Sequence, residues 1–96
     1  MPEYVIRSGD RAAFIAGLRE LADFLTANPA VLVPRNPSFG VIVDASDADS
    51  RREGTEHAAA PLGLRAEDLG EGYYGARLSF GPITYGVVAV PPEDRQ

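Results

Sequence analysis

The chain of 96 residues contains no cysteine and no lysine, and its one histidine is His57. Without cysteine, neither a disulfide framework nor a thiolate metal site can form. One histidine cannot build a structural zinc site within one chain. No serine stands in a Gly-x-Ser-x-Gly motif, which is typical of a strained nucleophile turn. These absences favour a protein with no cofactor, no metal and no catalytic residue over an enzyme, and a Mg²⁺-dependent enzyme stays open as an alternative.

Long apolar runs are also absent, so no segment approaches the length of a membrane span. The first residues lack the basic and apolar regions of a signal peptide, and we expect a cytoplasmic protein. The net charge of −5 argues against direct nucleic-acid binding, which needs a basic surface to meet phosphate. The charge is concentrated in residues 44–71, which carry eight acidic residues and three arginines, whereas six of each balance over the other residues.

Residues 10–27 are predicted to form a helix that begins at Asp10 and ends at Asn28-Pro29. Phe14, Leu18, Leu21 and Leu25 recur at helical spacing and form one apolar stripe. Such a stripe is typical of a helix that faces a core.

The C-terminal part is predicted to form a β-hairpin around Gly81-Pro82, where glycine supplies the positive φ of a two-residue turn. In that register one face is wholly apolar or aromatic, which a one-residue slip would destroy. Its opposed pairs are Phe80/Ile83, Leu78/Tyr85, Ala76/Val87 and Tyr74/Ala89.

The remaining elements are weaker. Tyr4–Arg7 is expected to be an edge strand or an arm within residues 1–8, and Phe39–Val43 reads as an inner strand because it is almost continuously apolar. A second helix is expected over about 47–60, where Ser46 followed by Asp49 is close to a capping box. Gly54 should weaken this helix, and residues 62–72 read as a connector.

The sequence thus predicts a single α+β domain spanning residues 1–96. We expect two helices packed on one face of a small, mainly antiparallel sheet, in the order β–α–β–α–β–β, with a mobile tail at 93–96. If Val31–Val33 also pairs, a ferredoxin-like arrangement is the alternative.

The second face of the hairpin is the first candidate for a functional surface. Its apolar residues would remain exposed once the helices cover the other face, and such patches mark partner sites. The candidate surface comprises Tyr73, Arg77, Val88 and Val90. We expect it to serve a protein partner or a homodimer, unless the N-terminal arm or the strap at 31–37 covers it.

The acidic segment allows three interpretations. The first is that its residues are ordinary caps and solvated charges, as most such residues are. The second is an acidic inhibitor or mimic that binds a basic partner through an acidic surface, and the third is a Mg²⁺-dependent enzyme site centred on Asp44 at a strand end. The acidic surface comprises Asp44, Asp47, Asp49, Glu53 and Glu56.

Three stretches carry a family resemblance: "FIAGLRELADFLTANP" from Phe14, "VIVDASD" from Val41, and "SFGPITYGVVAVP" from Ser79. Together they are similar to a type of small protein found in actinobacterial genomes and in their phages or integrated elements. The resemblance implies an intracellular bacterial or phage origin and no particular activity. Our expectation is therefore a small non-enzymatic interaction or accessory protein of a bacterial or mobile-element system.

Overall fold

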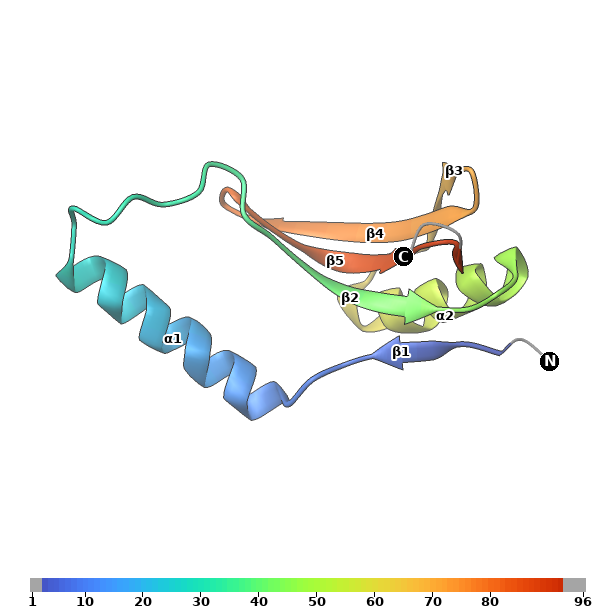
Figure 1. Ribbon diagram of the computed structural model, residues 1–96, viewed down its shortest axis with the longest axis horizontal. Coiled ribbons are helices and arrows are strands. Elements are labelled where there is room, and N and C mark those ends of the chain that lie inside the picture. Colours follow the sequence, from blue (N-terminus) through green and yellow to red (C-terminus); the bar gives the residue numbers. More distant parts are fainter. Residues whose placement is uncertain (1–2, 93–96) are drawn as a thin grey trace.

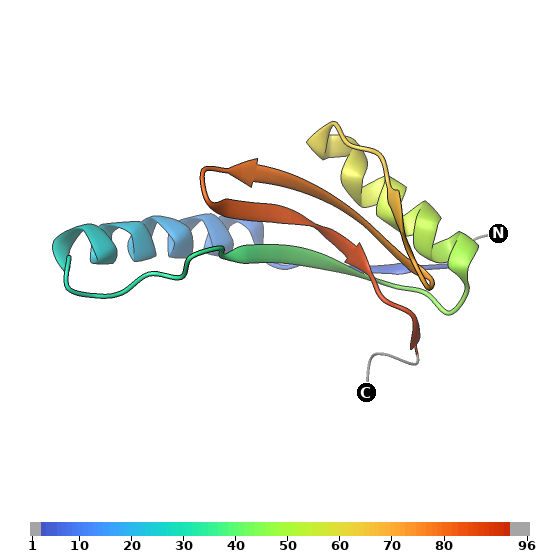
Figure 2. The same ribbon diagram turned by 90° about the horizontal axis from the view of Figure 1, so that it is seen from above.

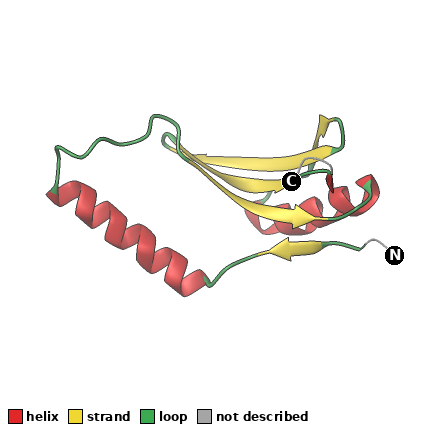
Figure 3. Ribbon diagram, in the orientation of Figure 1, coloured by secondary structure: helices red, strands yellow, loops and turns green. Residues whose placement is uncertain are grey.

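The computed structural model describes residues 3–92, which form an α+β fold and confirm the predicted class (Figure 3). The expected tail at 93–96 lies outside the described residues. The elements, in chain order, are β1 (Val5–Arg7), α1 (Arg11–Ala27), β2 (Ser38–Asp44), α2 (Ala48–Ala59), the short 3₁₀ helix η1 (Ala60–Leu62), β3 (Glu67–Gly70), β4 (Tyr73–Phe80) and β5 (Ile83–Ala89).

The strands form one sheet in the order β1-β2-β5-β4-β3 (Figure 1). The pair β2 and β5 is parallel and the other three pairs are antiparallel, so the sheet is mainly antiparallel as predicted. Within residues 3–92, Val31–Val33 is not a strand, and the condition for the ferredoxin-like alternative is not met. Pro34 and Pro37 follow it closely and lack the N–H groups that a ladder needs.

The hairpin has the predicted register, with Phe80 opposite Ile83, Leu78 opposite Tyr85, and Tyr74 opposite Ala89. Gly81 has a φ of 61°, as the turn requires. Strand β3 was not expected, because its residues Glu-Asp-Leu-Gly are exposed and give no alternating pattern. The turn after it brings β3 beside β4, with positive φ at Gly70, Glu71 and Gly72.

The core lies between α2 and one half of the sheet. Its buried cluster consists of Val43, Tyr74, Val87 and Ala89, with Tyr4, Ile6, Ala58 and Leu62 packed against it. Helix α2 comes closest at Gly54, where an added Cβ would lie 2.6 Å from Val43 Cγ1. Because Gly54 has no Cβ, α2 can lie close against the sheet at this point. The sequence alone marks the residue only as a weak helix former.

Helix α1 differs from the prediction, because it does not pack on the sheet beside α2. Of the residues that the structure describes in α1, none is buried. The helix leaves β1 beyond one end of the sheet, and residues 28–37 return from its far end to β2 (Figures 1 and 2). The molecule is consequently elongated, with extents of 49 × 28 × 25 Å.

In the part of the chain that the structure describes, neither helix is long and apolar enough to cross a membrane.

Candidate interaction surface

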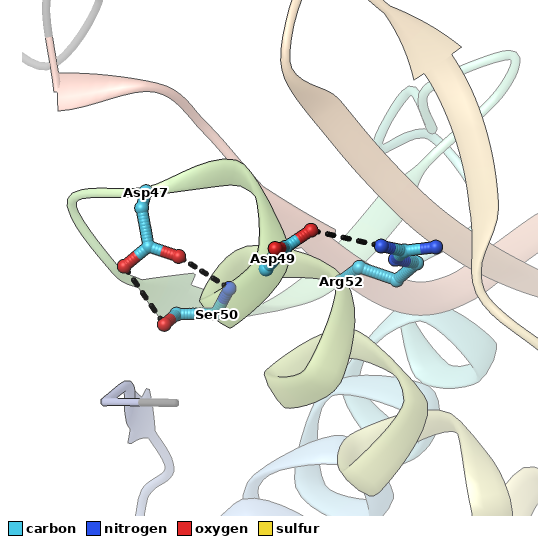
Figure 4. Close-up of polar contacts among 4 residues, drawn as sticks. All are labelled: Asp47, Asp49, Ser50 and Arg52. Atoms are coloured by element: carbon cyan, nitrogen blue, oxygen red, sulfur yellow. Dashed lines mark hydrogen bonds and ion pairs between the residues drawn. The ribbon is translucent and has the colours of Figure 1, made fainter. Parts of the chain in front are cut away.

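The acidic segment begins with the N-cap of α2, which is Asp47 and not the expected Ser46. The backbone N–H of Ser50 donates to Asp47 Oδ1 over 2.8 Å, and the Ser50 hydroxyl donates to Oδ2 over 2.9 Å (Figure 4). The N–H of Ser50 is the main reason that the pKa of Asp47 is lowered. Asp49 pairs with Arg52 over 2.9 Å on the helix surface.

Two of the other predicted acidic residues, Asp44 and Glu56, are also engaged within the chain. Asp44 forms an ion pair with Arg7 of β1. Glu56 pairs with Arg65 over 3.0 Å and accepts the backbone N–H of Ala66, which is the main cause of the lowered pKa of Glu56. Glu53 is exposed on α2. The Asp44 pair thus joins β2 to β1, and the Glu56 contacts join α2 to the segment that follows it.

A metal centre finds no support from the side-chain arrangement. Across residues 3–92, no three or more His, Cys, Asp or Glu side chains come together in a way that would hold a metal ion. His57 lies on α2 with its Nδ1 2.7 Å from the hydroxyl of Tyr4. Asp44, the predicted magnesium ligand, forms an ion pair with the guanidinium of Arg7.

The sequence did not predict the role of Arg51, which is buried in the first turn of α2. Its Nε donates to the carbonyl of Gly72 over 2.8 Å and its Nη1 to the carbonyl of Ala45 over 3.1 Å. Arg51 therefore ties α2 to the β3–β4 turn. The signal for this role is its position on the apolar face of the predicted helix.

The four residues of the predicted interaction surface fall into two pairs. Arg77 and Val88 line a hollow of about 260 Å³ on the sheet face away from α2. Tyr73 and Val90 are half-buried toward the other end of the strands. Three glycines, Gly40, Gly75 and Gly86, also line the hollow, and Leu69 of β3 lies within reach of Gly75.

Most of the exposed large apolar side chains lie elsewhere, on α1 and the end of the sheet beside it. We call the first group the α1 stripe: the exposed Phe14, Leu18, Leu21 and Phe24 with the half-buried Leu25. Leu21 is 50% exposed and Phe24 is 53% exposed. Four of these residues, Phe14, Leu18, Leu21 and Leu25, are the predicted stripe, to which Phe24 adds one edge, but the structure buries none of them against a core.

The second group, which we call the tip patch, lies at the hairpin end of the sheet. It comprises the exposed Phe80 and Ile83 with the half-buried Phe39, Leu78 and Tyr85, and Phe80 is 58% exposed. The paired strands put these residues on the same face as the core, but α2 covers only the other half of that face. Phe14 contacts this patch, with ring centroids 5.8 Å from Phe39 and 6.4 Å from Tyr85. Phe14 is therefore the residue at which the α1 stripe meets the tip patch, and both groups lie at the same end of the molecule.

Comparisons with known proteins found no match for the chain among protein-family models, curated proteins or solved structures.

Proposed function

We propose that this chain works through protein–protein contact, as a small non-enzymatic interaction or accessory protein. The observation that carries the proposal is the exposed apolar surface of the α1 stripe and the tip patch. A surface helix of a water-soluble domain normally buries its apolar stripe, and helical stability comes mostly from that packing. Here an amphipathic helix of 17 residues presents its stripe to solvent beside a second exposed apolar group. Exposed apolar surface of this kind is typical of interaction sites.

The chemistry of the surface favours a protein partner. Phenylalanine, tyrosine and leucine dominate it, and aromatic side chains are enriched at the centre of protein interfaces. The similarity to small proteins of actinobacteria and their mobile elements is the basis for expecting that partner in a bacterial or mobile-element system.

A photo-crosslinking amino acid placed at position 24 would test the proposal in living bacteria that express the chain. Phe24 lies on the α1 stripe, whereas Glu53 is an exposed residue of α2 at the other end of the molecule. The same crosslinker at position 53 is the matched control. We expect covalent protein adducts from position 24 and few from position 53.

The mass of the adduct identifies the class of partner. An adduct with twice the chain mass of 10.2 kDa reports a second copy, and any other mass reports a different protein. If position 24 yields no more adduct than position 53, the proposed function is overturned.

A further inference from the structure

We propose, resting on the proposed function, that the partner is a second copy of this chain. In the dimer the α1 stripe of each copy covers the tip patch of the other. The two surfaces are the two halves of an ordinary helix-on-sheet contact, and the fold keeps them apart within one chain except at Phe14.

The chain exposes more area than a compact monomer of its mass, and the excess is large enough to supply a dimer interface. A monomer of 10.2 kDa is expected to expose about 5,300 Å². This chain exposes 7092 Å², which is about 1,800 Å² more. Its radius of gyration is 15.5 Å, against about 12.5 Å for a compact domain of this length. A standard interface takes about 800 Å² from each partner, and obligate homodimers take more.

The topology explains why α1 remains outside its own domain. Strands β1 and β2 are adjacent and antiparallel, so the chain that joins them must leave and re-enter at the same end of the sheet. It does so as α1 followed by residues 28–37, and the pair projects as a loop beyond that end (Figure 2). Leu18, Leu21 and Leu25 follow Phe14 along the helix. Their side of α1 is therefore free to bind a second copy.

The charge distribution is compatible with the association of two identical copies at this end, because little repulsion arises between them. Helix α1 carries two arginines and two acidic residues, and the acidic segment 44–71 begins at the opposite end of β2. Two copies that join through their tip patches therefore bring together nearly neutral surfaces, and they keep their acidic ends apart. A twofold axis makes both contacts at once and closes the assembly, because each copy then uses its α1 stripe and its tip patch.

The test uses light scattering on the purified full chain and two charge variants. The stripe variant is Leu18→Glu with Leu21→Glu, and the tip variant is Phe80→Lys with Ile83→Lys; all four native side chains are exposed in the single chain. Matched controls carry the same charges on opposite faces. They are Ala12→Glu with Ala16→Glu on the far side of α1, and Ser79→Lys with Thr84→Lys on the far side of the hairpin.

We expect twice the chain mass for the native protein and both controls, and the mass of one chain for each interface variant alone. An equimolar mixture of the stripe and tip variants should form a heterodimer, because it has one native contact and one contact between glutamate and lysine. Circular dichroism on each variant checks that it remains folded.

Three results would overturn the inference. A native protein with the mass of one chain at all concentrations excludes the second copy, and the crosslinking experiment then decides separately whether another protein binds. A tip variant that remains dimeric excludes the reciprocal contact. A dimer that is broken by Tyr73→Ser with Val90→Ser, but not by the stripe variant, locates self-association on the outer sheet face.

Discussion

Gly54 shows how a residue that looks like a defect in the sequence becomes a packing requirement in the fold. A Cβ at this position would lie 2.6 Å from Val43 Cγ1 and 2.9 Å from the ring of Tyr4. Val43 is fully buried and its branched side chain has little freedom to move. The close approach of α2 to β2 therefore depends on the absence of a side chain.

We predict that Gly54→Ala lowers the free energy of unfolding by about 1–3 kcal/mol, as overpacking in a core does. Alanine improves helix propensity by about 1 kcal/mol, so the net loss must come from the clash. Urea denaturation measures the change.

The double variant Gly54→Ala with Val43→Ala is the control for this cause. Val43→Ala alone should cost about 2 kcal/mol, because it leaves a cavity. If the new Cβ at position 54 and Cγ1 of Val43 compete for the same space, the double variant loses less free energy of unfolding than the sum of the two single losses. Additive losses would contradict the proposed clash.

At the scale of elements, α2 is held by polar contacts as well as by its packed face. Asp47 caps its first turn, and Glu56 near its end accepts the N–H of Ala66 in the following segment. Arg51 joins its underside to the carbonyls of Ala45 and Gly72. These bonds satisfy backbone groups that a short helix and its flanking loops would otherwise leave open.

The two carboxylates predict a dependence of stability on pH. The pKa of Asp47 and that of Glu56 are lowered from the ordinary 3.8 and 4.5, chiefly by the backbone N–H groups of Ser50 and Ala66. The unfolded chain therefore binds more protons in acid than the folded chain. The stabilising contribution is complete above about pH 5.5, and it is lost as the pH falls through the lowered values. The urea midpoint should drop between about pH 5 and pH 3.

The variant Asp47→Asn with Glu56→Gln tests the assignment. Asparagine remains a good N-cap and glutamine remains an acceptor, but neither titrates. We expect a smaller drop of the urea midpoint over the same pH range. A drop as large as in the native chain would mean that other groups cause the acid sensitivity.

At the scale of the whole molecule, the elongated shape predicts a stability that depends on protein concentration. If the native state is a dimer, mass action raises Tm as the concentration rises. With about 0.7 kcal/mol of unfolding enthalpy per residue, each tenfold rise in concentration should raise Tm by about 3–4 °C. The stripe variant, Leu18→Glu with Leu21→Glu, should show a constant and lower Tm. A native Tm that does not change with concentration would contradict the dimer.

Local signals in the sequence determined the elements of this protein. The helical spacing of Phe14, Leu18 and Leu21 predicted α1, and the alternation around Gly81 predicted the hairpin with its register. Both signals depend on contacts between residues that are close along the chain, so a single sequence shows them. The weak strand β3 escaped notice because its four residues carry no such pattern.

Only the tertiary structure decided where these elements lie and which of their faces are covered. The sequence predicted that the stripe of α1 faces a core, but the antiparallel pairing of β1 with β2 carries the helix past the end of the sheet. The parallel pairing of β2 with β5, the burial of Arg51 and the closeness of Gly54 to Val43 likewise join residues distant in the sequence. Amphipathic periodicity shows that one face of a helix is apolar and is stabilised by burial. It does not show whether the same chain or another chain buries that face.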